Sequence, residues 1–223
     1  MKISRRLSVL ALSAVLFTSL TGFGLPSIPG VGGGSGGGGK WTQIVKDWKG
    51  GLSGLAKESA RLGYAQADLA EALGLKQEAA LMRGQAKNLE KSGDSLGGSE
   101  LKEFGKNSVA TQAAINDKIK STAKLSADQK AAMAQAGVKV SKSLVGIGKG
   151  VFILVQASSR AASSGAPNIT DIFALPVALE IPIMIPAAAF VIPKIFEVCY
   201  DFQKVAQEKN VAMPEIPKAP LFG

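Results

Sequence analysis

Apolar residues recur at intervals of three and four along most of this chain, and this rhythm restricts the fold more than any other feature. The first such stripe consists of Leu52, Leu55, Leu62, Leu69 and Leu73. A second stripe follows Gly74 in a different phase and consists of Leu75, Ala79, Met82, Ala86 and Leu89. The spacing places each stripe on one face of an α-helix. Gly74 is therefore either a break between two helices or a phase slip within one.

Two more helices are expected further along the chain. Residues 92–98 have the composition of a loop, Ser99 stands at an N-cap position, and a helix should follow over about residues 100–122. The buried side of that helix is marked by Leu101, Phe104, Ile115 and Ile119. Ser126 and Gln129 fit the capping-box pattern Ser-x-x-Gln, which starts the next helix. The stripe predicted for this next helix consists of Ala131, Ala134, Val138, Ser141, Val145, Gly148, Phe152 and Val155.

The C-terminal third contains an apolar segment, residues 172–193, that prolines interrupt. Its one charged residue is Glu180, and its prolines are Pro176, Pro182, Pro186 and Pro193. A proline inside a helix removes a backbone hydrogen bond and bends the axis, which argues against a straight transmembrane helix. The alternation of Ile181, Ile183 and Ile185 predicts a broken or partly extended segment over residues 172–185. A final helix should start near Pro186 and bend at Pro193.

These patterns predict an all-α protein, an irregular bundle of four to five helices with a proline-broken apolar C-terminal segment. We expect the apolar third to fold inward against the leucine-striped helices. The expected boundaries are a signal peptide over residues 1–24, a Gly/Pro-rich flexible tether over 25–39, the helical bundle domain over 40–212 and a Pro-rich extended tail over 213–223.

The first 24 residues have the layout of an export signal. A basic head containing Lys2, Arg5 and Arg6 precedes an apolar run over residues 7–20. The run is shorter than the roughly 20 residues that cross a bilayer as a helix, which favours a cleaved signal over an uncleaved membrane anchor. Small residues at the end of the run predict cleavage after Gly24. The protein is therefore expected to be periplasmic or secreted, in a bacterial cell.

The residue inventory excludes most catalytic chemistry. The chain has no histidine and one cysteine, Cys199, which excludes His-based triads, His metal sites and Cys-built zinc or iron–sulfur centres. The carboxylate pairs Glu100 with Glu103 and Glu197 with Asp201 have helical spacing, but such pairs are usually solvated. We therefore expect no enzyme activity, no catalytic residue, no cofactor and no metal. Apolar neighbours favour a buried, inert Cys199 thiol over one that links two chains.

Glu180 is unexpected in this apolar segment, because burying a lone carboxylate costs free energy. One interpretation is an exposed position at a proline break. The other is a buried polar contact, in which Glu180 partners Lys149 or Lys194 or lies in an apolar cavity.

The glycines around Lys149 resemble a phosphate loop only superficially. The segment lacks the Gly-Lys-Ser/Thr ending of a P-loop, and no strand-rich context surrounds it. We interpret Gly146 and Gly150 as a small-xxx-small contact for another helix.

Charge and hydropathy leave two rival functions. The net charge is +9, and the basic excess of the bundle lies in residues 40–142 without any block of consecutive Lys or Arg. We expect no nucleic-acid partner, and a solvated helix face is favoured over peripheral contact with an anionic membrane. The leading hypothesis is an exported non-enzymatic cell-envelope protein that binds a protein partner or an apolar ligand. The alternative is a membrane-active protein that inserts a hydrophobic hairpin, residues 144–157 and 172–192, into lipid.

Overall fold

The computed structural model describes residues 40–167 and 169–216, so the predicted signal peptide and tether lie outside the described residues. Within the described residues 88% are helical and no strand occurs, which confirms the all-α prediction. The α-helices are α2 (Lys40–Ala72), α3 (Lys76–Ser92), α4 (Gly98–Ser121), α5 (Ala127–Ser164) and α6 (Leu175–Glu208). Two short 3-10 helices, η2 (Gly93–Ser95) and η3 (Ile169–Ala174), precede α4 and α6.

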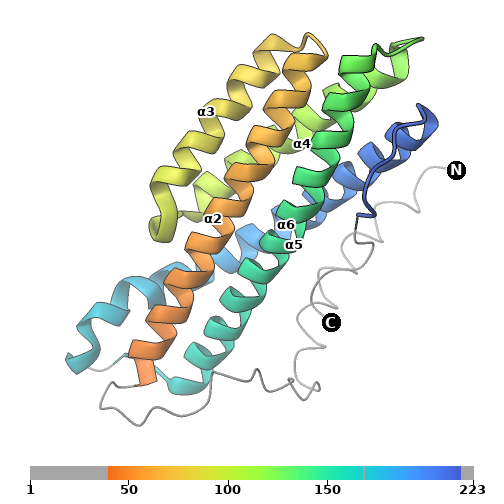
Figure 1. Cartoon of the computed structure of the whole chain (residues 1–223). Helices are drawn as coiled ribbons and strands as arrows, with labels where there is room; N and C mark the ends of the chain where they lie inside the picture. The colour runs from red at the N-terminus through yellow and green to blue at the C-terminus, as the bar shows by residue number, and fades with distance from the viewer. Residues whose placement is uncertain (1–39, 168, 217–223) are drawn as a thin grey trace, which may run out of the picture. The chain divides into compact units, whose positions relative to one another are not determined.

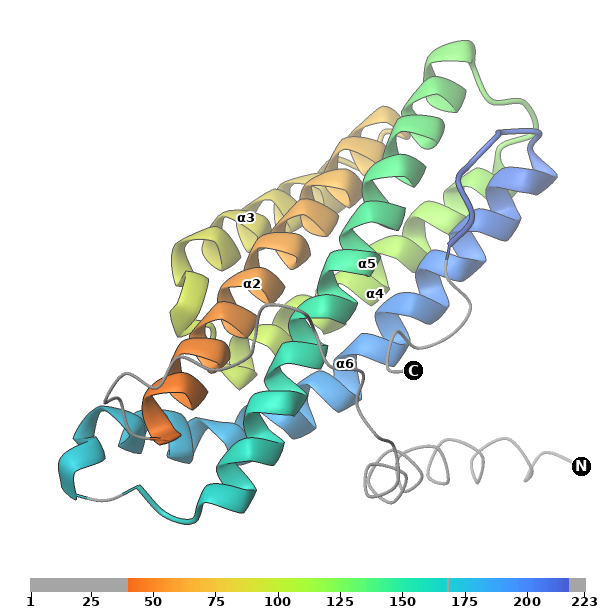
Figure 2. The same cartoon turned by 60° about the horizontal axis from the view of Figure 1, so that its bottom comes forward.

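Successive helices run up and down the bundle. In Figure 1, α2, α4 and α6 rise toward the upper right, and α3 and α5 run back. Helix α5 packs along α2, α3 covers another side of α2, and α4 packs along α6, as the rotated view in Figure 2 also shows. A small apolar cluster of Trp41, Ile44, Ala161 and Ala174 joins the start of α2, the end of α5 and the start of α6 at one end of the bundle.

Gly74 separates two helices. Its φ of +80° is open to glycine at little cost, and the turn is closed by two hydrogen bonds typical of a helix C-terminus. The N–H of Leu75 donates to the carbonyl of Ala70 at 2.8 Å, and the N–H of Gly74 donates to the carbonyl of Glu71 at 2.9 Å. This geometry is the Schellman motif, so the phase change between the two leucine stripes is a helix break.

Most of the predicted stripes form the core. The four stripe leucines of α2, Leu73 just after it and the stripe residues of α3 from Ala79 to Leu89 are buried, as are Leu101, Phe104, Ile115 and Ile119 of α4. The capping box of α5 is also confirmed, since the Ser126 Oγ accepts from the Gln129 N–H at 3.1 Å and the Gln129 Oε1 accepts from the Ser126 N–H at 3.0 Å.

The N-cap prediction for α4 is wrong. The cap is Gly97 and the helix begins at Gly98, while Ser99 is an exposed helical residue. A Cβ at Gly98 would lie 3.2 Å from the Ile183 carbonyl oxygen of α6. Helix α4 therefore begins where α6 approaches it closely. A local capping pattern does not encode that approach.

The stripe predicted for α5 is also wrong in phase. Ala131 and Val138 are exposed, and most of the other predicted positions are only half-buried. The buried face instead consists of Met133, Ala136, Val140, Leu144, Ile147, Val151 and Leu154. Because α5 carries apolar residues on several sides, two registers fit the sequence, and packing against α2 selects one of them.

The contact between α2 and α5 depends on glycines. A Cβ at Gly150 would lie 3.0 Å from the backbone nitrogen of Leu55, and one at Gly146 would meet the side chain of Glu58. On the other side of the interface, a Cβ at Gly51 would lie 2.8 Å from Leu154 Cδ2. The prediction that Gly146 and Gly150 form a helix contact is therefore confirmed.

Helix α6 corrects the prediction of an extended segment over residues 172–185. The helix is continuous from Leu175 to Glu208 and includes Pro182, Pro186 and Pro193. These three prolines are exposed and lie on one face, at spacings of four and seven residues. The lost N–H groups therefore fall on the solvent side, while the opposite face packs against α4 and keeps the segment helical.

The chain after α6 turns back onto the bundle. Residues 211–216 have no helix, and the Ile216 N–H donates to Gln203 Oε1 at 3.0 Å. Ile216 is fully buried, and a Cβ at Gly137 would meet the Met213 side chain. The described part of the predicted Pro-rich tail is thus packed, and residues 217–223 lie outside the described residues.

Candidate functional site

The inner face of the first half of α6 is part of the core. Its buried residues are Val177, Met184, Ala187, Ala188, Val191 and Ile192. Glycines of α4 make room for this face, because a Cβ at Gly105 would lie 3.0 Å from Val191 Cβ. The expected inward folding of the apolar segment therefore holds for this side of the helix.

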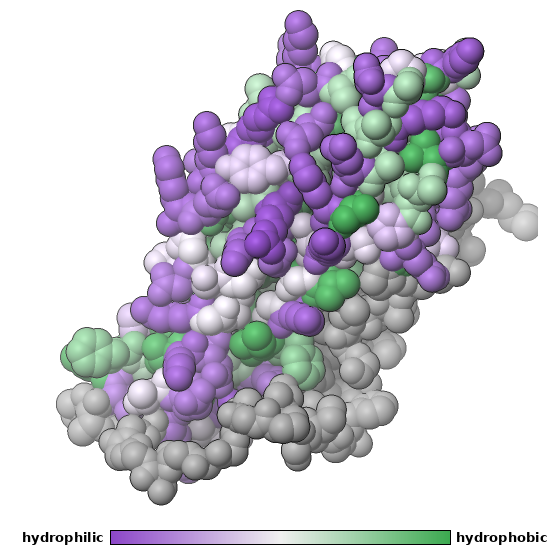
Figure 3. Space-filling view, in the orientation of Figure 1, coloured by the Kyte–Doolittle hydropathy of each residue, from purple (hydrophilic) through white to green (hydrophobic). Residues whose placement is uncertain are grey.

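The outer face of the same half is exposed and apolar. We define the outer stripe as Ile172 and Phe173 of η3 together with Leu175, Leu179, Ile183 and Phe190 of α6; these residues are between 47% and 87% exposed. These are six of the nine large apolar residues that are exposed among the described residues. Figure 3 shows apolar side chains on the surface at the lower left, where Figure 1 places η3 and the first turns of α6. Apolar patches of this kind mark interaction sites.

The hydropathy of α6 sets it apart from an ordinary core helix. The segment Asp171–Glu208 is the one helix among the described residues that is long and apolar enough to cross a membrane, by length and composition. A core helix of similar hydropathy would be mostly buried, but only 33% of its most apolar window is buried. This helix therefore has more apolar residues than it buries against the rest of the bundle.

The structure places Glu180 beside a buried tryptophan. The indole N–H of Trp48 donates to Glu180 Oε2 at 3.1 Å, and Trp48 is fully buried. Glu180 itself remains exposed. The carboxylate therefore lies at the boundary between solvent and the core, where it satisfies a donor that would otherwise be buried without a partner.

The two lysines proposed as partners of Glu180 lie elsewhere. Lys194 is exposed, and its Nζ lies 3.7 Å from the centroid of the Phe190 ring. Lys149 is exposed on α5. Among the described residues no salt bridge joins Glu180 to either lysine.

An apolar hollow of about 320 Å³ adjoins the start of α6. It is lined by Trp41, Ser158, Ala161, Ala162, Gly165, Ala166, Pro167, Ala178 and Ile181. Within the described part of the chain, the buried indole nitrogen of Trp41 has no hydrogen-bond partner. The hollow thus lies between the start of α2, the end of α5 and the first turns of α6, and no residue of the outer stripe lines it.

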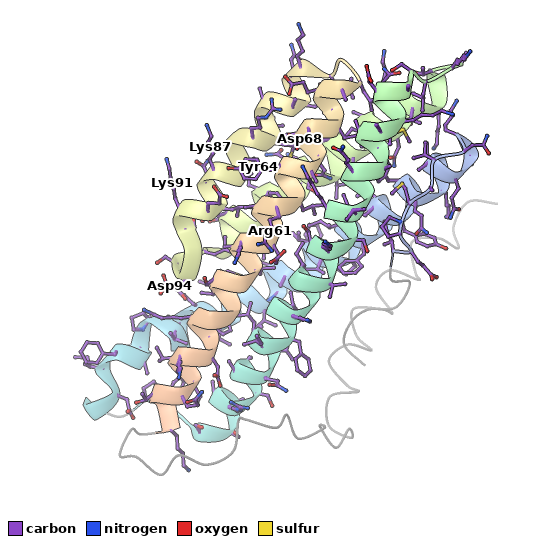
Figure 4. The ribbon with its side chains drawn as sticks, viewed as in Figure 1. Arg61, Tyr64, Asp68, Lys87, Lys91 and Asp94 are labelled. Atoms are coloured by element: carbon purple, nitrogen blue, oxygen red, sulfur yellow. The ribbon has the colours of Figure 1, made fainter. Side chains whose placement is uncertain are left out.

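A second group of polar residues lies on α2 and α3 but has mixed charges. Figure 4 shows Arg61, Tyr64 and Asp68 on α2 near Lys87 and Lys91 of α3. The Tyr64 hydroxyl donates to Glu90 Oε2 at 2.9 Å, and partial burial together with this carboxylate raises the pKa of Tyr64. Asp68 accepts from Lys139 at 2.9 Å. Arg61 pairs with Glu58, and the charged side chains of this group are exposed and of both signs, which is typical of a solvated helix surface.

Reactive groups for catalysis are scarce in the described residues. No group of three or more His, Cys, Asp or Glu side chains there could hold a metal ion. Cys199 is buried, and this burial raises the pKa of its thiol to about 12. A thiol that stays protonated at neutral pH is a poor nucleophile, so the predicted inert character of Cys199 agrees with its environment.

Sequence reasoning missed the outer stripe because residues 172–193 are apolar on every side. A signal was nevertheless present in the proline positions. Pro182, Pro186 and Pro193 share one helical face, and a proline is tolerated best where its missing N–H points toward solvent. Leu179, Ile183 and Phe190 lie on the same side of the helix. Reading the prolines as markers of the exposed face would have located the stripe.

Compared with known proteins, the chain matches no family model, no curated protein and no solved structure. The function is therefore inferred from the outer stripe of α6 and its surroundings.

Proposed function

We propose that this protein is an exported, non-enzymatic protein of the cell envelope that binds an apolar partner through the outer stripe of α6. The observation that carries the proposal is the clustering of exposed large apolar side chains on η3 and on one face of the first half of α6. The export signal in the sequence supports the location, and the shortage of reactive side chains supports a binding role.

The size of the stripe suits a binding surface. Burying one Leu, Ile or Phe side chain contributes about 1.5–3 kcal/mol. Association costs about 4–15 kcal/mol of translational and rotational freedom, so one or two exposed residues would not hold a partner. Six partly exposed side chains in a continuous stripe supply enough area to exceed the lower end of that cost.

A second candidate function is insertion of residues 144–157 and 172–192 into lipid as a hairpin. The hydropathy and low burial of α6 favour it. Helix α5, however, packs its buried Leu144, Ile147 and Leu154 in the core beside α2. Insertion would require this contact to separate, whereas binding through the outer stripe leaves it intact.

Photo-crosslinking in the cells that make the protein tests the proposal. A photoreactive phenylalanine analogue replaces Leu179 in the outer stripe or Lys204 in the second half of α6, and the full chain is expressed in both cases. We expect a crosslinked product from position 179 and none from position 204. If position 179 yields neither a lipid nor a protein adduct, the proposed function is wrong.

The location is tested separately by mass spectrometry of the protein extracted from its cell fraction. The expected mass corresponds to a chain that begins at Leu25 and is found in the envelope or the medium. A cytoplasmic protein with an intact N-terminus would contradict the exported location but not the binding role of the stripe.

A further inference from the structure

The last described residues of the chain occupy a groove between α5 and α6. We define the strap as residues 213–216, which have no helix and lie between these two helices after the chain turns back from the end of α6 (Figure 2). We propose that the groove is a binding site for an extended peptide segment, filled in the monomer by the chain's own strap and in a dimer by the strap of a second copy. The groove borders the second half of α6, so this inference is independent of the outer stripe.

Side chains of both helices hold one peptide bond of the strap. The hydroxyl of Ser141 on α5 donates to the Glu215 carbonyl at 3.3 Å. The side-chain oxygen of Gln203 on α6 accepts from the Ile216 N–H at 3.0 Å. The carbonyl and the N–H belong to the same peptide unit, so the two helices hold it from opposite sides. Contacts of this kind bind the backbone of an extended segment, and pockets for its side chains add specificity.

Two side chains of the strap provide that specificity. Ile216 is fully buried and belongs to the main core cluster. Met213 is half-buried and packs against a second cluster, which contains Phe202 of α6. Gly137 of α5 makes room for it, because a Cβ there would lie 3.1 Å from Met213 Cγ. The groove therefore accepts a segment with a long apolar side chain at one position and an isoleucine three residues later.

The strap is joined to α6 through an exposed residue. The N–H groups of Asn210 and Val211 close the end of α6 by donating to carbonyls of its last turn, each at 3.0 Å. Ala212 follows, is exposed and donates no backbone hydrogen bond among the described residues. Rotation about Ala212 can therefore move the strap out of the groove while α6 and its C-terminal turn stay folded.

The strap covers only part of the groove. A second hollow, of about 330 Å³, lies between the strap and α6 and is lined by Tyr200, Gln203, Lys204, Gln207, Met213 and Glu215. A close-packed core element leaves no space of this size. The strap thus fits the groove as a bound segment does, and the hollow gives an incoming segment access to Gln203.

A second copy of the chain is the partner whose fit the structure already displays. Its strap has the same two anchoring side chains and the same peptide unit, and exchange of an identical segment between two copies preserves their contacts. The short connection gives a chain's own strap an effective concentration on the order of millimolar. The monomer therefore predominates at lower protein concentrations, and exchange is best observed when a chain's own strap cannot close.

Binding of a labelled strap peptide to full-length chains tests the groove. The probe is a fluorescein-labelled peptide with the sequence of residues 209–217, and fluorescence anisotropy measures its binding. In Ile216→Asp the chain's own strap carries a charge that the buried position excludes, which frees the groove. This variant should bind the probe at least about tenfold more tightly than wild type, whose own strap competes. The matched control Ala212→Asp adds the same carboxylate at an exposed position and should bind like wild type.

A second variant guards against a loss of folding. Ile216→Ala weakens the chain's own strap without adding a charge, and it decides the test if circular dichroism shows that Ile216→Asp is unfolded. It should also bind the probe more tightly than wild type. A probe that itself carries Ile216→Asp should not bind. The proposal is overturned if neither variant binds the original probe more tightly than wild type, or if both probes bind equally well.

Mixing two defective chains tests whether the partner is a second copy. Ile216→Asp has a free groove and a defective strap, and Ile216→Ala replaces it if it does not fold. Gly137→Leu has an intact strap sequence and a blocked groove, because the new side chain takes the space of Met213. In analytical ultracentrifugation each variant alone should be a monomer, and the mixture should contain a heterodimer.

The control for this mixture lacks both functional parts in one chain. Gly137→Leu/Ile216→Asp has neither a free groove nor an intact strap, so it should form no heterodimer with Ile216→Asp. A mixture of the two single variants that stays monomeric, although the labelled peptide binds, overturns the second copy as the partner. A heterodimer that also forms with the double variant shows an interface elsewhere and overturns strap exchange.

Discussion

The two halves of α6 have similar inner faces and opposite outer faces. Met184 and Val191 in the first half and Cys199 and Phe202 in the second are all buried. The outer face over residues 175–193 is apolar, whereas the outer face over 194–208 carries exposed charges at Lys194, Glu197, Asp201, Lys204 and Glu208. Packing alone requires apolar residues only on the inner face. The apolar outer face of the first half is therefore unexplained by folding, and the proposed binding role rests on it.

The largest expected effect compares one phenylalanine from each half. Phe202→Ala should lower the free energy of unfolding by about 3–5 kcal/mol, because Phe202 is fully buried and its removal leaves a cavity. Phe190→Ala should cost at most about 1 kcal/mol, the value of its contact with Lys194. Urea unfolding measures both. Equal losses would mean that the outer stripe supports the fold, which would remove its link to function.

Gly105 of α4 tests how tightly the first half of α6 packs against α4. Gly105→Ala should destabilise the chain by about 1–3 kcal/mol, because the new Cβ meets the stiff Val191 side chain. The matched control is Gly84→Ala in α3, where a Cβ meets nothing within 4 Å. That variant should raise stability by about 0.5–1 kcal/mol. A neutral Gly105→Ala variant would show that α6 can shift away from α4 at no cost.

One carboxylate from each half provides the third comparison. Glu180→Ala should cost about 1–3 kcal/mol, since the buried Trp48 indole loses its acceptor. Glu197→Ala, on the exposed face of the second half, should stay within about 0.5 kcal/mol of the wild type. Thermal unfolding distinguishes the two. If Glu180→Ala is as mild as Glu197→Ala, water replaces the carboxylate at the indole and Glu180 has no structural role.

Because Cys199 is buried in the second half of α6, the free energy of unfolding should depend on pH. Its thiol has a pKa of about 12 in the folded chain, against 9.0 for an ordinary cysteine. The stabilising effect of this raised pKa is complete below pH 9 and declines as the pH rises toward 12, because the unfolded chain then loses the proton first. At pH 10, wild type should lose about 1 kcal/mol relative to Cys199→Ala, compared with their difference at pH 8. Urea unfolding measures this difference. If wild type and Cys199→Ala differ in stability by the same amount at pH 8 and pH 10, the thiol is not buried.

The smallest expected effect on stability is at the centre of the outer stripe. Leu179→Gln replaces a largely exposed side chain with another good helix former, so the free energy of unfolding should change by no more than about 0.5 kcal/mol. A stability loss above 1 kcal/mol would show that residue 179 packs against the bundle in solution.

Local patterns identified much of the fold in advance. The leucine stripes of α2 and α3, the buried residues of α4 and the Ser126–Gln129 capping box depend on neighbours within a few residues, and the structure confirms them. The polar candidate Glu180 was also found from its sequence surroundings. Its partner Trp48 was not, because the two residues are 132 positions apart and nothing local links them.

The errors in α5 and in the apolar segment share one physical origin. In α5 and in residues 172–193, apolar residues occur on several sides of the helix, so periodicity alone does not identify the buried side. Packing against α2 selected the register of α5. Packing against α4 kept α6 helical through Pro182 and Pro186 and left Leu179 and Ile183 facing outward.

The sequence by itself determined that the chain forms helices, where several of them end, and that conventional catalytic groups are scarce. It did so because helix periodicity, caps and residue chemistry are local properties. Only the tertiary structure decided which side of the apolar segment is buried. That choice depends on where glycines such as Gly98 and Gly105 let another helix approach. The apolar side of α6 that stays exposed is the candidate binding surface.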